Sequence, residues 1–148
     1  MEKSGEPRYS VSFSLQGRDF LEGGKASSGI KSRLKEIGIA PAVIRRVAII
    51  AYEAEMNVII HADHGTVKAK INTEKVVIDV TDKGPGIEDI NKAMEEGYTT
   101  VPPEILEMGF GAGMGLPNIK KYSDELKIDS KVNEGTRLYA VVYLNQNG

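Results

Sequence analysis

Cysteine and tryptophan are both absent from this chain of 148 residues. The lack of cysteine excludes disulfides, thiolate zinc sites, CxxC redox chemistry and cysteine nucleophiles. Aromatic residues make up only 6% of the chain, which disfavours a stacking surface for single-stranded nucleic acid. A formal net charge of -2 gives no overall attraction to phosphate backbones, so we expect no nucleic-acid partner.

Long apolar runs are missing too. The longest one, Val47 to Tyr52, is far shorter than the roughly 20 residues that a membrane-spanning helix needs. The opening residues contain no apolar stretch that could form the core of a signal peptide. The sequence therefore predicts a cytoplasmic protein that does not contact a membrane.

The remaining composition is that of one ordinary globular domain, residues 1–148. Apolar residues make up 41% of the chain and charged residues 27%, a balance that argues against disorder. A chain of this size buries roughly two-thirds of the surface that its unfolded form exposes, so it needs neither a metal nor a disulfide for stability.

Hydrophobic periodicity divides the chain into strands and helices. Alternation predicts a half-buried strand at Tyr9–Leu15, and Asp19 is expected to cap a helix that stops at Gly38. A second helix, from about Pro41 to Ala62, is apolar on nearly all sides and is expected at the centre of the domain. The other predicted elements are strands at 66–71, 76–81, 125–132 and 137–144, helices at 88–96 and 115–122, and an irregular segment over 97–112.

The order of these elements is β-α-α-β-β-α-α-β-β, with no internal repeat and no linker that would divide the chain. This order favours an α+β fold. The fold expected is a two-layer α/β sandwich, with the helices on one face of a mixed, mostly antiparallel sheet.

Three polar residues share one face of the apolar second helix: Glu53, Asn57 and His61 follow one another at intervals of four residues. Burying them costs several kcal/mol in total unless each finds a partner. A carboxylate can orient or deprotonate a hydroxyl, and an amide oxygen suits Mg²⁺ that is bound beside phosphates. The alternative is the polar edge of an amphipathic helix, and this feature alone does not decide between the two.

Two glycine-containing segments follow. Asp82-Lys-Gly-Pro-Gly-Ile87 comes directly after a predicted strand. Its Asp can accept a hydrogen bond from an exocyclic amine while its glycines admit a planar ring, although an ordinary turn uses the same residues. Gly109-Phe-Gly-Ala-Gly-Met-Gly-Leu116 opens onto a predicted helix, whose free N–H groups can cradle phosphate oxygens. It lacks the GKS or GKT of a P-loop and the preceding strand of a Rossmann site, and a flexible loop explains it about as well.

Taken together and in this order, the three segments resemble the N box and the two glycine boxes of the GHKL (Bergerat-fold) ATPase superfamily, which includes gyrase-type and histidine-kinase domains. The resemblance spans roughly Glu53 to Thr136. Within the superfamily the chain is most similar to the anti-sigma-factor and switch serine/threonine kinases of bacterial partner-switching pathways. Three sequence segments carry this similarity: Asp82-Lys-Gly-Pro-Gly-Ile-Glu-Asp-Ile90, Glu96-Gly-Tyr-Thr-Thr100 and Gly111-Ala-Gly-Met-Gly-Leu-Pro117.

The resemblance implies a role for each matched residue. Glu53 would activate the attacking hydroxyl, and Asn57 would bind Mg²⁺. Asp82 would accept a hydrogen bond from the adenine amino group in a pocket that Thr136 completes, and His61 would lie near the phosphates. The residues implied in nucleotide binding are Asn57, His61, Asp82, Gly84, Gly86, Ile87, Gly111, Gly113, Met114, Gly115, Leu116 and Thr136.

The implied function is that of an ATP-dependent serine/threonine protein kinase, with ATP and Mg²⁺ as cofactors, that serves as an anti-sigma or switch factor in transcription regulation. The implied acceptor is a Ser or Thr of a small STAS-type antagonist protein, and a sigma factor or another regulatory protein is the competing partner. Homodimers are common in the anti-sigma branch, so the resemblance also allows a homodimer. The alternative is a nucleotide-sensing module that sequesters its partner without transferring phosphate.

Basic residues are missing from the segment that the resemblance makes a lid over the nucleotide. No Lys or Arg lies between Lys92 and Lys120. Sporulation-type anti-sigma kinases carry an arginine where this chain has Gly111-Ala112. Because a cation there neutralises charge on the transferring phosphoryl group, we expect a largely open lid and slow transfer until a partner docks.

Overall fold

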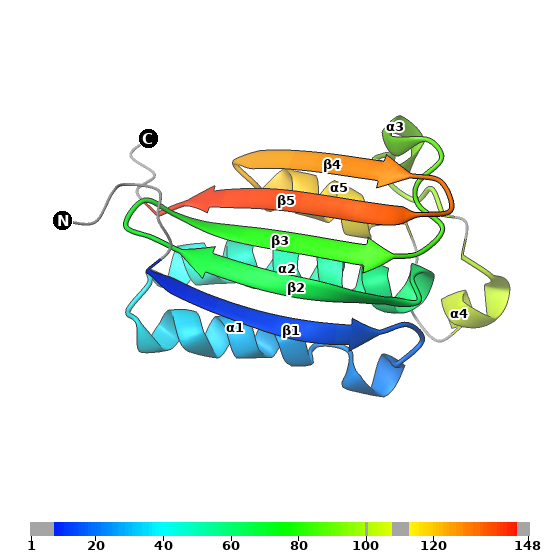
Figure 1. The fold of residues 1–148 in the computed structure, drawn as a ribbon. Coiled ribbons are helices and arrows are strands. Elements are labelled where there is room, and N and C mark those ends of the chain that lie inside the picture. The colour runs from blue at the N-terminus through cyan, green and yellow to red at the C-terminus, as the bar shows by residue number, and fades with distance from the viewer. Residues whose placement is uncertain (1–7, 100, 108–112, 145–148) are drawn as a thin grey trace.

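A single five-stranded sheet forms one layer of the protein. The computed structural model describes residues 8–99, 101–107 and 113–144. The strands lie in the order β1-β2-β3-β5-β4, and each neighbouring pair is antiparallel (Figure 1). The mostly antiparallel sheet is therefore confirmed, with no parallel pair in the described ranges. The strands are β1 (Tyr9–Gln16), β2 (His64–Ile71), β3 (Lys75–Lys83), β4 (Glu125–Lys131) and β5 (Gly135–Tyr143).

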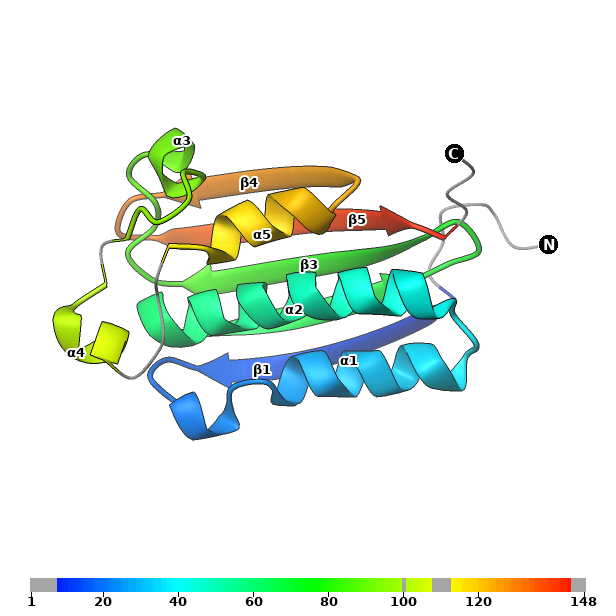
Figure 2. The same cartoon turned by 180° about the vertical axis from the view of Figure 1, so that it is seen from behind.

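Helices form the second layer. In the view from behind, α1, α2 and α5 lie side by side over one face of the sheet (Figure 2). This arrangement confirms the predicted two-layer sandwich. The described helices are the short 3₁₀ helix η1 (Phe20–Glu22), α1 (Lys25–Glu36), α2 (Pro41–His61), α3 (Ile90–Ala93), α4 (Pro103–Glu107) and α5 (Gly115–Tyr122).

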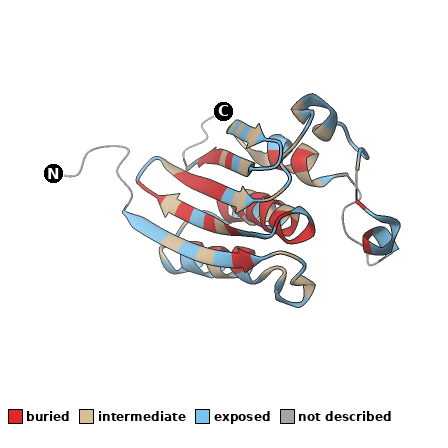
Figure 3. Cartoon of the chain, turned by 45° about the vertical axis from the view of Figure 1, so that its right-hand side comes forward, coloured by how far each residue is buried: buried red, intermediate tan, exposed pale blue. Residues whose placement is uncertain are grey.

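The hydrophobic core lies between the two layers, around β3 and α2. All residues of β3 from Val76 to Val80 are buried, as expected for a central strand (Figure 3). On α2, Val47 and Ile50 are fully buried against the sheet. The apolar second helix is thus the central one, as predicted, and truncating a side chain such as Ile50 would cost about 2–5 kcal/mol.

The start of α1 differs from the prediction. The Asp19 side chain caps no helix; it precedes η1, and α1 begins only at Lys25, after Gly24 with φ +100°. The cap comes instead from α2. Glu55 is fully buried and accepts 3.0 Å hydrogen bonds from the backbone N–H groups of Gly24, Ala26 and Ser27. These N–H groups have no partner within α1, and the positive end of the helix dipole favours a carboxylate there.

The segment from Glu88 to Glu107 also differs from the prediction. The expected helix at 88–96 is shortened to α3, which Asp89 caps by accepting from the N–H of Lys92. A helix that was not expected, α4, follows in the segment predicted to be irregular. Val101 and Ile105 are buried there against a second apolar cluster formed by Met56, Ile59 and Ile60. The described residues around Val101 and Ile105 therefore pack on α2, because these isolated apolar residues find a partner surface only in the folded chain. That the segment stays open over a nucleotide is a prediction that this packing does not test.

Candidate functional site

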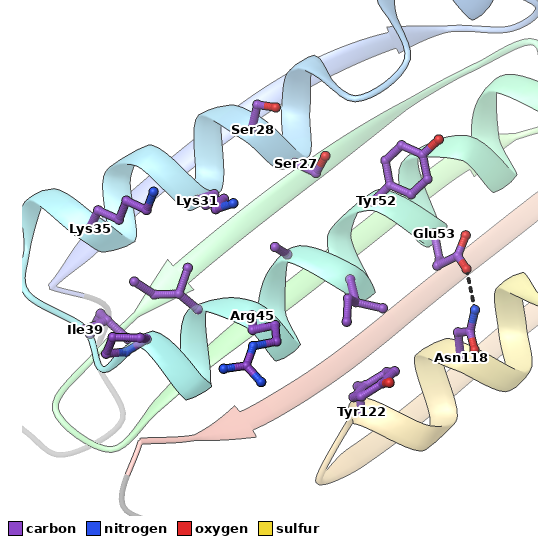
Figure 4. Close-up of a pocket in the computed structure, with 14 residues that line it drawn as sticks. Ser27, Ser28, Lys31, Lys35, Ile39, Arg45, Tyr52, Glu53, Asn118 and Tyr122 are labelled. Carbon is purple, nitrogen blue, oxygen red and sulfur yellow. Dashed lines mark hydrogen bonds between the residues drawn. The ribbon is translucent and has the colours of Figure 1, made fainter.

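The polar face of α2 begins at Glu53. Its side chain is partly buried and accepts a 2.7 Å hydrogen bond from Nδ2 of Asn118 in α5 (Figure 4). Since α5 packs beside α2, this bond joins two neighbouring helices of the layer. It also limits the orientations that the carboxylate can adopt. A group that is to receive a proton from a fixed direction must be oriented in this way.

Asn57 and His61 follow on the same face, as the four-residue spacing predicts. Asn57 is partly buried, whereas His61, the last residue of the helix, is exposed. Partial burial lowers the pKa of His61, and the positive charge of Arg18 lowers it further. The imidazole is therefore neutral at pH 7, so it can exchange hydrogen bonds with a ligand but brings no positive charge to it.

Asp82 lies near the end of β3, half-buried beside the first residues of β5. One of its carboxylate oxygens, Oδ1, accepts a 3.2 Å hydrogen bond from the backbone N–H of Thr136. Burial raises the pKa of Asp82, and the hydrogen bond from Thr136 partly opposes this rise. A carboxylate that is kept partly out of water favours a ligand with a hydrogen-bond donor, because such a donor replaces the lost solvation.

Gly84 and Gly86 shape the turn after β3. Gly86 has φ +75°, and a Cβ placed there would lie 2.3 Å from the carbonyl oxygen of Lys131. The carbonyl of Pro85 accepts a 2.8 Å hydrogen bond from the N–H of Asn133 in the β4–β5 turn. The two turns therefore pack directly on each other, and this packing alone requires glycine at position 86, whether or not a ligand binds. Contact between these glycines and an adenine ring stays a prediction.

Ser130 in β4 is a residue of this region that the motifs do not identify. Its Oγ accepts a 2.7 Å hydrogen bond from the N–H of Ile87 and lies 2.8 Å from Oγ1 of Thr136. It thereby connects the turn after β3 with the start of β5. The register of the β4–β5 hairpin sets Ser130 opposite Thr136, and that register is the sequence signal from which it could be found.

The glycine-rich segment leads into α5. Gly111 lies outside the described residues. Gly113 has φ +83°, and its carbonyl accepts a 3.0 Å hydrogen bond from the N–H of Gly97. A Cβ at Gly113 would lie 2.5 Å from the carbonyl carbon of Gly97, whereas a Cβ at Gly115 would meet no atom within 4 Å. Among the described residues, the space beside Gly115 is therefore open, and binding of phosphate by the N–H groups at the start of α5 stays a prediction.

Two side chains next to these glycines have opposite environments. Met114 is 38% exposed, and Leu116 is buried in the main core. Leu116 therefore anchors the first turn of α5, while Met114 remains accessible to a ligand.

The structure brings some of these groups together through the backbone. Ala62, which follows α2, packs against Gly84, so close that a Cβ at Gly84 would lie 2.9 Å from Ala62 Cα. The C-terminal end of α2 therefore meets the end of β3 that carries Asp82. In the part of the chain that the structure describes, Glu53, Asn57 and Asp82 form no hydrogen bonds with one another.

The described side chains could contribute one ligand to a metal ion whose other ligands are phosphate oxygens and water. Within residues 8–99, 101–107 and 113–144, no group of three or more His, Asp or Glu side chains could hold a metal ion. Asn57 is partly buried, and its side chain forms no hydrogen bond with another described residue. One amide oxygen is a suitable protein ligand for Mg²⁺ beside phosphates, because this ion keeps several waters.

A groove of about 910 Å³ lies over the helices and extends to Glu53. Its walls come from α1, α2 and α5, and it includes Asn118 and Tyr122 as well as Glu53 (Figure 4). None of the residues predicted to contact adenine lines it. Glu53 therefore lies at the boundary between this groove and the region around Asn57 and Asp82.

Comparisons with known proteins agree with this arrangement. The model of the family described as "Histidine kinase-like ATPase domain" matches residues 24–142. The serine/threonine-protein kinase RsbT of Bacillus subtilis (strain 168) is 31% identical over 114 residues, which cover 74% of this chain and 80% of that protein. The anti-sigma F factor of Caldanaerobacter subterraneus subsp. tengcongensis is 37% identical over 100 residues, which cover 64% of this chain and 66% of that protein.

A solved structure shows the same fold. A chain in the crystal structure of the SiaB-SiaC complex from Pseudomonas aeruginosa aligns with a TM-score of 0.60 and 17% identity, over 89% of this chain and 88% of that one. Among the helices in the described ranges, none has both the length and the hydropathy that a bilayer span requires.

Proposed function

The chain belongs to the family of histidine kinase-like ATPase domains, and from this premise we propose that it is an ATP-dependent serine/threonine protein kinase built as a single domain. The family match confirms the resemblance to GHKL ATPases. The observation that carries the kinase proposal is the position of Glu53, a carboxylate that Asn118 holds at the end of an open groove. A carboxylate in such a position can take the proton of an attacking hydroxyl. The similarity to a protein named as a serine/threonine kinase supports the same activity.

In this proposal the nucleotide binds where the end of α2 meets the end of β3. Asp82 accepts a hydrogen bond from the adenine amino group, and Thr136 contributes its hydroxyl to the same pocket. The backbone N–H groups at the start of α5 bind the phosphates, with help from the helix dipole. Asn57 holds Mg²⁺, which neutralises phosphate charge when it is bound.

The transfer step itself needs little covalent chemistry from the protein. The hydroxyl oxygen of a Ser or Thr forms a bond to the terminal phosphorus of ATP, and the bond from that phosphorus to the leaving oxygen of ADP breaks. Glu53 receives the hydroxyl proton, and Asn118 keeps its carboxylate in place. Phosphoryl transfer depends mainly on such positioning and on charge neutralisation.

The proposed acceptor is a small STAS-type antagonist protein in the cytoplasm. A sigma factor or another regulatory protein competes for the kinase, so that phosphorylation controls transcription, and the kinase itself can act as a homodimer. Two similarities support a partner-switching role: one relative is named an anti-sigma F factor, and the solved relative comes from a complex of two proteins, SiaB and SiaC.

A second function deserves a test because the segment between Lys92 and Lys120 contains no Lys or Arg. A lid without a cation cannot neutralise the transferring phosphoryl group from its own side chains. A nucleotide-sensing module that holds its partner in the ATP-bound state, without phosphoryl transfer, does not need that cation.

Labelled ATP distinguishes these functions. The protein is incubated with Mg²⁺, ATP labelled at the terminal phosphate and a purified STAS-type protein that is encoded next to its gene. We expect label on a Ser or Thr of that protein, reduced roughly 10²-fold by Glu53→Ala. An ATP-dependent complex without label would favour the sensing module, and steady ATP turnover without an acceptor would indicate a hydrolase.

A further inference from the structure

The groove over the helical layer has an uneven distribution of charge. Two basic side chains, Lys31 and Lys35, come from α1, and a third, Arg45, comes from α2. Lys35 and Arg45 lie toward the end of the groove that is opposite Glu53, and Lys31 lies between (Figure 4). The groove therefore has a cationic part and, at its other end, the carboxylate proposed to act on a hydroxyl.

The three cations do not stabilise the fold through ion pairs or hydrogen bonds with the described residues. None of Lys31, Lys35 and Arg45 forms an ion pair or a hydrogen bond with another described residue, and all three are exposed. Other basic residues of the same helices are paired: Arg33 with Glu36 in α1, and Arg46 of α2 with Asp124. The unpaired cations thus gather on the side of α1 and α2 that faces the groove.

The wall that α2 contributes to the groove is apolar and includes Ile44, Ala48 and Ile49. Ser27 and Ser28 of α1 line the opposite side, and Ile39 lies at the end beside Lys35 and Arg45 (Figure 4). Tyr52 lies beside Glu53 and is 41% exposed. An occupant that matches these walls has apolar side chains between a hydroxyl at Glu53 and negative charge at the cations.

The helix geometry fixes the spacing of such an occupant. Arg45 and Glu53 are eight residues apart on α2, so at a rise of 1.5 Å per residue they are separated by about 12 Å along the helix. An extended chain advances about 3.3 Å per residue and covers this distance in about four residues. Acidic side chains that reach the cations therefore lie about three to five residues from the hydroxyl.

We propose that this groove docks an extended acidic segment of the phosphoacceptor protein: a Ser or Thr at Glu53, small apolar residues along the floor, and Asp or Glu at the position of Lys31, Lys35 and Arg45. This inference rests on the kinase activity proposed above, and it adds the surface that selects the acceptor. Charge complementarity with Asp and Glu also excludes basic segments, which like charges repel.

The test uses a library of synthetic peptides, each with one central serine and fully degenerate flanks. The immobilised protein, loaded with Mg²⁺ and a non-hydrolysable ATP analogue, retains the peptides that bind. We expect about a tenfold preference for Asp and Glu over Lys and Arg, three to five residues from the serine on one side, because several exposed charge pairs act together. The preference should shrink at high salt, which screens such pairs.

A charge-reversed variant provides the decisive comparison. In the triple variant Lys31→Glu, Lys35→Glu, Arg45→Glu, the preference should invert toward Lys and Arg. Arg33→Glu is the matched control, since it changes an exposed, paired cation of α1 and should leave the preference as it is. Both variants should keep the helix content of the wild type and its affinity for ATP. The proposal is overturned if no peptide is retained, if the wild type shows no acidic preference, or if the triple variant shows the same preference as the wild type.

Labelled ATP, given in place of the analogue, separates this proposal from the kinase proposal. Acidic selection among retained peptides, together with failure to label any of them, would support the groove and contradict the kinase activity. Labelled peptides without acidic selection would support the kinase activity and contradict the groove.

Discussion

Nδ2 of Asn118 donates a 2.7 Å hydrogen bond to Oε2 of Glu53, and this bond joins residues that are 65 positions apart in the chain. The donor belongs to α5, the helix that begins in the glycine-rich segment, and the acceptor belongs to α2. The helix expected to bind phosphates at its start thus also holds the carboxylate expected to receive the proton.

Asn118→Ala should reduce phosphoryl transfer about tenfold while the affinity for ATP changes by no more than a few-fold, because the side chain positions Glu53 without contacting the nucleotide. Single-turnover transfer and calorimetric ATP binding measure the two effects. In a Glu53→Ala background the same change should have no further effect on transfer, since the bond is already gone. An equal loss in both backgrounds would contradict the positioning role.

Glu53→Ala should keep the affinity for ATP within a few-fold and lower phosphoryl transfer by roughly 10²-fold or more. A base that acts on the transferred proton contributes to the transition state more than to ground-state binding. Binding and transfer are measured on the same preparation. Equal losses in the two would assign Glu53 a structural role instead.

Asn57→Ala should remove the Mg²⁺-dependent part of ATP binding while the fold survives. The amide is partly buried and makes no hydrogen bond with another described residue, so its removal leaves no protein partner unsatisfied. Calorimetry with and without Mg²⁺ measures the effect, and circular dichroism checks the fold. An unchanged affinity for Mg·ATP would show that Asn57 is not the ligand.

Asp82→Asn should stabilise the protein at neutral pH. It should also weaken ATP binding about 10- to 100-fold, which corresponds to the free energy of losing one hydrogen bond to a charged group. Burial raises the pKa of Asp82 above its usual value of 3.8, so folding favours the protonated carboxyl. Its stabilising contribution is complete below pH 3.8 and is lost as the pH rises through the pKa of the folded state. The gain in melting temperature from Asn should therefore be present at pH 7 and disappear in acid.

Asp79→Asn is the matched control on the same strand. Asp79 is 7% exposed and accepts hydrogen bonds of 3.2 and 2.9 Å from the guanidinium of Arg137. Because this charge has a close partner, its removal should lower the melting temperature at pH 7. If Asp82→Asn raised the melting temperature by the same amount in acid and at neutral pH, burial of the Asp82 charge would not explain the gain.

Glu55→Gln should destabilise the fold by about 2–4 kcal/mol, because the amide replaces one of two carboxylate oxygens that accept from the start of α1. Glu53→Gln, two residues away on the same helix, should change the free energy of unfolding by no more than about 0.5 kcal/mol. Urea unfolding followed by circular dichroism measures both variants. Similar losses for the two would show that Glu55 is not the anchor of α1.

Hydrophobic patterns were sufficient to predict the strands and the long helices of this fold. The strands, the central position of α2 and the helix stop at Gly38 follow from periodicity and from turn chemistry, which act locally. The motifs likewise identified the face of α2 that carries Glu53 and the strand end that carries Asp82. The helix predicted at 88–96 is present only as the shorter α3, and α4 was not predicted, because Val101 and Ile105 are ordered by contacts with α2 rather than by their neighbours in sequence.

The residues that sequence reasoning missed act over long distances in the chain. Glu55 is one polar position on an apolar helix, and only the packing of α1 shows why it can be buried. The predicted cap, Asp19, lies too early in the chain, and Gly23-Gly24 weakens a helix start locally, so no neighbouring residue indicates the carboxylate that accepts from these N–H groups. Asn118 has no local signal at all, because its partner, Glu53, lies on another helix.

Gly97 and Gly113 are joined by a backbone hydrogen bond, so the two ends of the segment that separates them in the sequence lie side by side. Lengthening a closed loop is inexpensive, about 0.6 kcal/mol for each doubling of its length. Residues can therefore be inserted or deleted between these two glycines without disturbing the strands of the sheet. The segment predicted to close over the nucleotide is in this respect exchangeable: we expect that a corresponding stretch from another family member, joined at Gly97 and Gly113 and apolar where Val101 and Ile105 contact α2, would change rate and partner choice while the sheet is retained.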